Sequence, residues 1–217
     1  MAQGDHAHDH PHINTSEHGL TYYEKRIIAL SNLLIDKGLI SSQDLLDVLK
    51  EMDDTTSMVG ARVVARAWGD PAFKQRLLQD ANLVMSELGI NLQRFRLLKV
   101  LENTAAVHNA IVCTLCSCYP IPLLGHPTGW YNDGSYRSWM VEDPRACLAD
   151  MGLHIPDAQD IRVWDSTAEV RYLVLPQRPA GTDGMTQEQL AQLVTRDSMI
   201  GVGLPLTPNQ MPTPSDP

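Results

Sequence analysis

Three of the four cysteines in this chain stand within six residues, at Cys113, Cys116 and Cys118. A disulfide framework would distribute its cysteines along a secreted chain. The first residues are polar and contain no apolar core of a secretory signal, so we expect a cytoplasmic protein. In such a protein clustered cysteines indicate metal or redox chemistry, and the fold has to bring these three sulfur atoms together.

The bulk composition is that of a globular protein. The 217 residues can bury a substantial core, and 43% of them are hydrophobic and 20% charged. The net charge of -9 argues against nucleic-acid binding, since contacts with phosphates need clustered lysine and arginine. No apolar run is long enough to cross a bilayer. We therefore expect neither nucleic acid nor a membrane as a partner.

The first part of the chain divides into a polar tail and a helical region. Residues 1–18 are polar, with a histidine at every second position from His6 to His12. They lack the apolar side chains of a core, so we predict a disordered tail, with metal capture by the histidines as the alternative. Apolar residues at helical spacing and cap signals then predict four helices. These helices are expected at residues 21–38, 41–52, 58–68 and 70–89.

The second part contains short stretches rich in β-branched and aromatic residues, which predict strands. The strands are expected at residues 97–101, 110–113, 161–164 and 170–175, the last two as a pair joined by a polar turn. Well-capped helices are expected at 143–152 and 186–195. We predict an α+β fold with a helical N-terminal arm (19–89), a layered metal-binding α/β domain of short strands flanked by helices (90–204), and an extended proline-rich tail (205–217).

The spacing of the cysteines allows three kinds of site. A structural zinc site needs four ligands, and Cys147 would have to be the fourth, although it lies inside a predicted helix. A redox pair of Cys113 and Cys116 needs a strand–helix–strand context that the sequence does not show. The third kind is a compact site for a more highly charged metal, in which backbone nitrogens complete the coordination. Spacing alone leaves all three open.

The residues between the cysteines add a resemblance. Residues 112–119 read Val-Cys-Thr-Leu-Cys-Ser-Cys-Tyr and resemble the metal-binding motif of nitrile hydratase alpha subunits. Thr114 is similar to the residue of the cobalt class, whereas iron-type members have serine there. Further similar blocks stand at residues 101–109, 169–176, 178–182 and 194–201. The resemblance extends from about residue 20 to residue 204.

The resemblance implies one low-spin cobalt(III) ion per chain. In the family the cysteine at the place of Cys113 is an axial thiolate, the one at Cys116 is oxidised to sulfinate, and the one at Cys118 to sulfenate. The deprotonated backbone amides of Ser117 and Cys118 complete the ligand set, and the sixth position takes water or substrate. A trivalent ion suits this set because only a strongly polarising cation displaces an amide proton. The resemblance thus implies a lyase that adds water to a nitrile and releases the amide.

Residues around the cysteines are assigned through the same resemblance. Asp165 and Arg171 correspond to family residues that lie near the metal loop. The resemblance therefore implies that these two side chains act in catalysis together with Cys116 and Cys118, by supporting the oxidised sulfurs through hydrogen bonds. The alternative for Asp165 and Arg171 is a surface salt bridge between them. A glutamine found near the site in relatives has only a weak counterpart in Gln93.

The substrate pocket is expected to include Ile121, Trp130 and Tyr131. Relatives commonly have tryptophan where this chain has Ile121, so the resemblance implies a wider pocket that accepts a bulky or heteroaromatic nitrile. The equally weighted alternative is compensation by a larger residue of a partner.

The implied partners are a beta-type subunit, whose arginines bind the oxidised sulfurs, and an activator or metallochaperone that loads cobalt. Two other functions stay open. One is the catalytic subunit of thiocyanate hydrolase, which shares the cobalt motif. The other is a non-catalytic metal-binding or metal-delivery module, to which the histidine-rich tail would contribute.

Overall fold

The computed structural model describes residues 21–54, 56–92, 96–116 and 118–211. The expected histidine-rich tail at 1–18 and the end of the proline-rich tail therefore lie outside the described residues. The chain divides into two compact units, residues 1–50 and residues 51–217.

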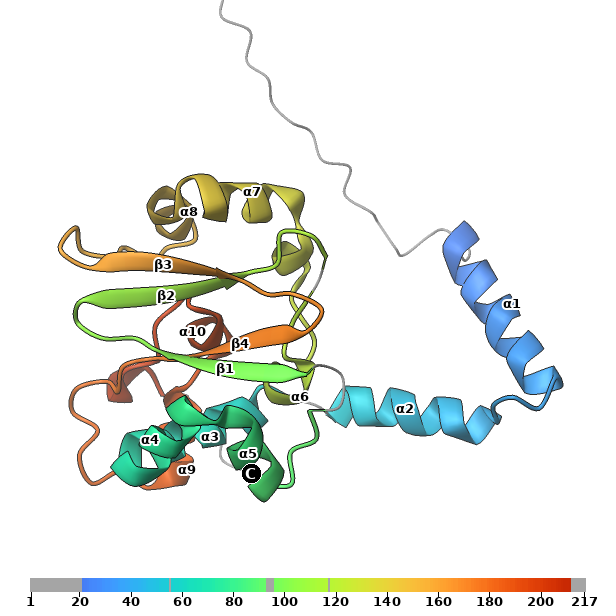
Figure 1. Cartoon of the computed structure of the whole chain (residues 1–217), viewed down its shortest axis with the longest axis horizontal. Coiled ribbons are helices and arrows are strands. Elements are labelled where there is room, and N and C mark those ends of the chain that lie inside the picture. The colour runs from blue at the N-terminus through green and yellow to red at the C-terminus, as the bar shows by residue number, and fades with distance from the viewer. Residues whose placement is uncertain (1–20, 55, 93–95, 117, 212–217) are drawn as a thin grey trace, which may run out of the picture. The chain divides into compact units, whose positions relative to one another are not determined.

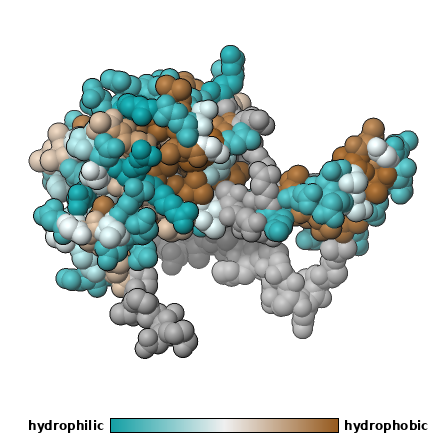
Figure 2. Space-filling model, turned by 90° about the horizontal axis from the view of Figure 1, so that it is seen from below, coloured by the Kyte–Doolittle hydropathy of each residue, from teal (hydrophilic) through white to brown (hydrophobic). Residues whose placement is uncertain are grey.

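The first unit holds helix α1 (Tyr22–Asp36) and most of α2 (Ser42–Asp54). Helix α1 begins with the predicted capping box, in which the Thr21 hydroxyl and the Glu24 carboxylate each accept a backbone N–H of the other residue. No residue of α1 is buried. Its largest apolar side chains lie on the surface, and Figure 2 shows brown patches over the part of the chain that α1 and α2 form. The exposed ones are Tyr22, Tyr23, Ile27, Ile28, Leu30 and Leu33.

The second unit is built on α3 (Met58–Gly69), whose small apolar residues are buried in the core. Helix α3 packs against α9 (Gln187–Leu193) and against α6 (Ile121–Leu124), the short helix that follows the cysteines. A Cβ atom at Gly60 would lie 2.7 Å from the carbonyl oxygen of Leu123, so glycine is required for this close approach. Helix α3 thus fixes the chain directly after the cysteine loop.

One predicted helix is wrong in its extent. Residues 70–89 form two helices, α4 (Pro71–Gln79) and α5 (Ala81–Glu87), instead of one. Asp80 separates them, with a ψ of 85° that is not helical. Its side chain accepts a hydrogen bond from the backbone N–H of Leu83, as an N-cap residue does. Apolar periodicity alone predicts one continuous helix over these residues. The hydrogen bond from Leu83 to the Asp80 side chain instead begins a new helix.

The part of the chain that the structure describes contains four strands, which form two parallel pairs. Strand β1 (Leu97–Glu102) pairs with β4 (Val170–Leu175), and β2 (Val107–Val112) pairs with β3 (Asp160–Asp165). In Figure 1 the strands lie one below another in the order β3, β2, β4, β1.

The predicted pairing of β3 with β4 is wrong. The backbone N–H of Ser166, directly after β3, donates to Val112 of β2, whereas the Glu169 carbonyl, directly before β4, accepts from Leu97 of β1. The polar turn therefore carries the chain from one strand pair to the other and does not form a hairpin.

Helices cover the strand pairs at both ends of the second unit. Figure 1 shows α7 (Gly134–Glu142) and α8 (Pro144–Asp150) beside β3, with α4 and α5 beside β1. One hydrophobic core contains residues of α3, α4 and α5 together with residues of β1, β2 and β4 and of the later helices. The expected arm boundary at residue 89 hence lies inside a compact unit, because these helices bury their apolar faces in the same core as the strands.

Three elements complete the described chain: the 3-10 turns η1 (Gly129–Asn132) and η2 (Pro208–Gln210), and the short helix α10 (Arg196–Ile200). No helix among the described residues is long and apolar enough to cross a membrane. The predicted helices at 143–152 and 186–195 are confirmed as α8 and α9.

A buried polar network holds β2, the strand that leads to the cysteines. The His108 Nε2–H donates to the Gly201 carbonyl at 2.7 Å, and Nδ1 accepts from the Asn103 amide at 3.2 Å. Gly201, at a φ of 88°, ends α10, and a Cβ there would lie 2.0 Å from the Asn109 carbonyl oxygen. The strand and the helix end are thus in direct backbone contact.

Candidate metal centre

The three clustered cysteines lie on the loop that leaves β2. Their sulfur atoms all lie within 4.8 Å of one another. The Cys113 and Cys116 sulfurs are 3.3 Å apart, and the Cys116 and Cys118 sulfurs are 3.0 Å apart. Cys113 and Cys118 are buried, whereas Cys116 is exposed. The two ends of the loop are therefore anchored in the protein, and its middle faces outward.

The geometry narrows the kinds of site that the spacing left open. Among the described residues the cluster contains these three cysteines and no fourth cysteine, histidine or carboxylate. Cys147 is buried in α8 outside the cluster, as a small apolar residue, and burial raises the pKa of its thiol. The four-ligand zinc site with Cys147 is thus wrong. Ser117, the predicted source of an amide ligand, lies outside the described residues, as does Gln93.

Asp165 anchors the start of the loop. It is the last residue of β3, and the pairing of β3 with β2 sets it opposite Val112. Its carboxylate accepts the backbone N–H of Thr114 at 3.0 Å and the hydroxyl of the same residue at 2.5 Å. The expected neighbourhood of Asp165 and the cysteine loop is therefore present, with Thr114 as the partner that sequence reasoning did not identify.

Tyr131 anchors the end of the loop. Its hydroxyl donates to the Cys118 carbonyl oxygen at 2.9 Å. The side chain is fully buried, and its ring packs edge-on against Tyr119 with centroids 5.0 Å apart. Tyr131 was expected in the substrate pocket, but in this chain its side chain lies beneath the loop with no exposed surface. No local pattern signals this hydrogen bond, because it joins residues of separate elements.

Arg171 supplies positive charge to the cluster from β4, where it stands opposite Leu98. Burial is the largest influence on the Cys118 thiol and raises its pKa, and the neighbouring Cys116 acts in the same direction. The Arg171 guanidinium group lowers this pKa but only in part, so the net pKa of Cys118 is raised. Burial and the neighbouring cysteine thus oppose ionisation of the Cys118 thiol, and Arg171 favours it.

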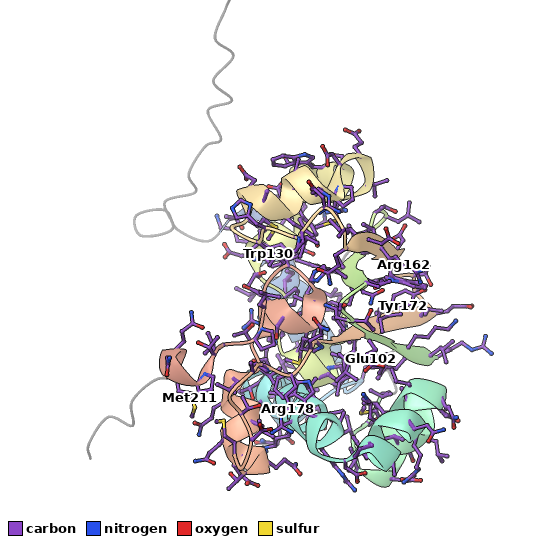
Figure 3. The ribbon with its side chains drawn as sticks, turned by 90° about the vertical axis from the view of Figure 1, so that its left-hand side faces the viewer. Glu102, Trp130, Arg162, Tyr172, Arg178 and Met211 are labelled. Atoms are coloured by element: carbon purple, nitrogen blue, oxygen red, sulfur yellow. The ribbon has the colours of Figure 1, made fainter. Side chains whose placement is uncertain are left out.

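The two other expected pocket residues lie after the loop. Ile121 is the first residue of α6, and its backbone N–H donates to the Tyr119 carbonyl at 2.9 Å. Trp130, labelled in Figure 3, is half-buried in η1 and packs edge-on against Tyr136 with centroids 4.9 Å apart. Both side chains are partly accessible to solvent. Both residues lie in the sequence between Cys118 and Tyr131, whose hydrogen bond joins the two ends of this segment.

A separate cavity of about 340 Å³ has no cysteine in its lining. It lies between Trp68, Glu102 and Arg178, the last two labelled in Figure 3. The polar groups around it bind one another: the Trp68 indole donates to Pro176, and Lys74 forms a 2.9 Å ion pair with Glu102. These contacts join α3 and α4 to the ends of β1 and β4 and serve the fold.

Comparison with known proteins gives consistent results. The low-molecular weight cobalt-containing nitrile hydratase subunit alpha of Rhodococcus rhodochrous is 53% identical over 188 residues, covering 85% of this chain and 90% of the relative. The thiocyanate hydrolase subunit gamma of Thiobacillus thioparus is 40% identical over 190 residues, covering 82% of this chain and 78% of the relative.

Among solved structures, a double mutant of the Fe-type nitrile hydratase from Comamonas testosteroni matches with a TM-score of 0.82 and 38% identity, covering 90% of this chain and 96% of that chain. The family model for nitrile hydratase, alpha chain, matches residues 21–203, close to the extent that the motifs indicated. The chain belongs to the nitrile hydratase alpha chain family.

Proposed function

We propose that this chain is the metal-carrying subunit of a cobalt-type nitrile hydratase, a lyase that hydrates a nitrile to the amide. The observation that carries the proposal is the convergence of three cysteine sulfurs within 4.8 Å on one loop. The relative from Rhodococcus rhodochrous, whose name includes cobalt, supports the choice of metal.

The donor set fits this metal. Thiolate sulfur is a soft, strongly donating ligand, and three such donors on one short loop favour a compact site over a four-ligand zinc site. The backbone N–H of Cys116 points at the Cys113 sulfur at 3.3 Å, so the loop is already wound tightly around the sulfurs. Cys113, Cys116 and Cys118 would hold the ion, with backbone amides of Ser117 and Cys118 as the remaining protein donors.

Each residue has a distinct part in the proposed reaction. When bound, cobalt(III) supplies the Lewis acidity that polarises the nitrile or lowers the pKa of a water molecule. Asp165 holds the start of the loop through Thr114, and so keeps the cysteines at a fixed separation. Arg171 favours an anionic Cys118, the state that both metal binding and sulfur oxidation require.

A beta-type partner subunit belongs to this proposal. Leu115, in the middle of the loop, is 88% exposed, and Cys116 is exposed beside it. The chain by itself thus leaves one side of the site open to water, and charged oxygens on oxidised sulfurs would need donors from elsewhere. An activator or metallochaperone would deliver the cobalt. Cytoplasmic residence, as expected from the sequence, fits the four cysteines, none of which forms a disulfide.

The second candidate is thiocyanate hydrolase, favoured by the 40% identity with the gamma subunit of that enzyme. We give it second place because the relative from Rhodococcus rhodochrous is more similar, at 53%. A metal-delivery module ranks third.

The experiment is co-expression of the chain with its beta-type partner in cobalt-containing medium, followed by assays on an aliphatic nitrile, an aromatic nitrile and thiocyanate. The proposal expects amide formation and one cobalt per chain. Turnover of thiocyanate alone would favour the second candidate. Readily exchangeable metal with no turnover of any of the three compounds would favour metal delivery.

A further inference from the structure

The end of the cysteine loop is held from beneath by a residue of a different element. Cys118 is only 5% exposed, and its carbonyl oxygen needs a donor because burial removes the water that would otherwise bind it. The Tyr131 hydroxyl supplies that donor at 2.9 Å. The phenol is itself completely buried, so its own hydrogen bond is equally required. The two groups satisfy each other across thirteen residues of chain.

Tyr131 holds the backbone at Cys118 through ring packing as well as through the hydrogen bond. The Tyr131 ring also packs edge-on against Tyr119, the next residue along the chain. The Cys118 carbonyl and Tyr119 belong to the same peptide unit, so the orientation of that unit is set on both sides. Its orientation fixes the backbone dihedral angle ψ of Cys118, and the backbone dihedral angles in turn limit the side-chain rotamers that can direct the Cys118 sulfur.

We infer that Tyr131 is a positioning residue for the metal centre, which holds Cys118 with its sulfur directed at Cys116. The inference rests on the proposed function and extends it to a residue that does not itself touch metal or substrate. The Cys116 and Cys118 sulfurs are 3.0 Å apart, and the inference makes this separation depend on the Tyr131 hydrogen bond. Together with Asp165 at the start of the loop, Tyr131 closes the loop at both ends.

The test compares two buried tyrosines whose hydroxyl groups donate to the backbone carbonyls of different residues. Tyr136 is also buried and in the same aromatic cluster, 6.0 Å from Tyr131 between centroids, but its hydroxyl donates to Ile111, the next-to-last residue of β2, and not to a cysteine of the loop. Tyr131→Phe and Tyr136→Phe each remove one buried hydrogen bond to a carbonyl. A merely structural role predicts the same consequences for both variants.

The first readout does not depend on catalysis. The assembled, reduced protein is titrated with Co²⁺ alone, and binding is followed by the absorption of the thiolate-to-cobalt transition. We expect Tyr131→Phe to weaken Co²⁺ binding by about tenfold and to shift the absorption band, while Tyr136→Phe leaves both close to wild type. Incorporation of 3-fluorotyrosine at position 131 keeps the ring and the donor and should restore the wild-type affinity. If Tyr131→Phe fails to assemble, the absorption band of the 3-fluorotyrosine protein is the readout. Its more acidic hydroxyl donates more strongly to the Cys118 carbonyl, so the inference expects a shifted band, and an unshifted band would overturn it.

The second readout is turnover of a nitrile by the loaded enzyme, where Tyr131→Phe should lower kcat by about tenfold with a smaller change in KM. Equal Co²⁺ affinities and spectra in the two phenylalanine variants would overturn the inference. Absence of nitrile turnover in the wild type, with the affinity difference still present, would overturn the proposed function and leave the positioning role intact.

Discussion

The carboxylate of Asp165 holds Thr114 by two hydrogen bonds, one to its backbone N–H and one to its hydroxyl. Thr114 directly follows Cys113, so the carboxylate at the end of β3 fixes the loop that leaves β2. The parallel pairing of the two strands brings their carboxyl ends together, and thus a residue far along the chain supports the sulfur cluster.

Removal of this support should disturb the metal site more than the fold. We predict that Asp165→Ala lowers cobalt content or kcat by about 10- to 100-fold, the usual effect of losing a residue that orients a metal ligand. The matched control is Asp160→Ala, which removes an exposed carboxylate from the other end of the same strand. Cobalt analysis and steady-state kinetics of the assembled enzyme provide the measurement. Equal effects of the two substitutions would exclude a specific role for Asp165.

The four cysteines should separate into two groups. We predict that alanine at Cys113, Cys116 or Cys118 abolishes cobalt binding, because each loss removes a ligand and the chelate geometry that lowers the amide pKa. Cys147→Ala should bind cobalt normally and cost about 1 kcal/mol in unfolding free energy, as a small buried substitution does. Metal analysis and denaturant unfolding distinguish the groups. Loss of cobalt from the Cys147 variant, with retention in the Cys118 variant, would reverse the assignment.

The chain without a partner should be nearly inactive even when loaded with metal. Leu115 and Cys116 face outward, so the site lacks one wall and the donors that would bind oxidised sulfurs. Nitrile turnover of the metal-loaded chain alone is compared with that of the complex at equal cobalt content. Equal turnover in the two preparations would show that this chain completes the site unaided.

Substrate size should depend on Ile121. Tryptophan in relatives would present a planar wall where this chain presents a smaller, partly accessible side chain. We predict that the wild-type enzyme prefers a bulky aromatic nitrile over a small aliphatic one, and that Ile121→Trp shifts this preference toward the small nitrile by about 1–3 kcal/mol. The ratio of kcat/KM values measures it. A wild-type preference for the small nitrile, unchanged by the substitution, would contradict a wider pocket.

Acid should weaken the fold through His108. Burial lowers the pKa of this histidine below its usual range, and the hydrogen bonds at both ring nitrogens fit the neutral ring. The unfolded chain takes up the proton more readily, so stability is complete above about pH 6.5 and is lost as pH falls through the lowered pKa of the folded state.

We therefore predict that His108→Gln, which cannot gain a proton, reduces the difference in unfolding free energy between about pH 7 and about pH 5. At neutral pH it should cost about 1–2 kcal/mol for the altered buried hydrogen bonds. His154→Gln, at an exposed position in the same unit, is the control and should leave the pH dependence unchanged. If His108→Gln shows the same difference in unfolding free energy between the two pH values as the wild type, other titratable groups cause the loss of stability in acid.

Local signals were sufficient for much of the fold. The capping boxes at Thr21 and Thr186 mark helix starts correctly because each depends on residues only three positions apart. The partners of β3 and β4 were not predictable in the same way. Adjacent strands in sequence suggest a hairpin, whereas these strands pair with β2 and β1, and that choice depends on packing of the whole unit.

The site shows the same division. The cysteine motif is contiguous, so the sequence alone was sufficient to identify it and its resemblance to the motif of the family. The supports of the loop are not, since Thr114 meets Asp165 fifty-one residues later and Cys118 meets Tyr131 in another element. Tyr131 was assigned to the pocket from its position after the motif, but its complete burial gives it a different environment. Hydrogen bonds of this kind become visible only when the fold is known.

The most direct test of the central claim is the chemical state of the cysteines in the assembled protein. Trypsin cuts after Lys99, Arg137, Arg145 and Arg162, so Cys113, Cys116 and Cys118 are recovered in the peptide 100–137 and Cys147 in the peptide 146–162. Mass spectrometry after dimedone trapping is combined with metal analysis. The account predicts one cobalt per chain, sulfinate at Cys116, sulfenate at Cys118, and unmodified Cys113 and Cys147. Zinc in place of cobalt, with all four cysteines unmodified in a catalytically active complex, would contradict it.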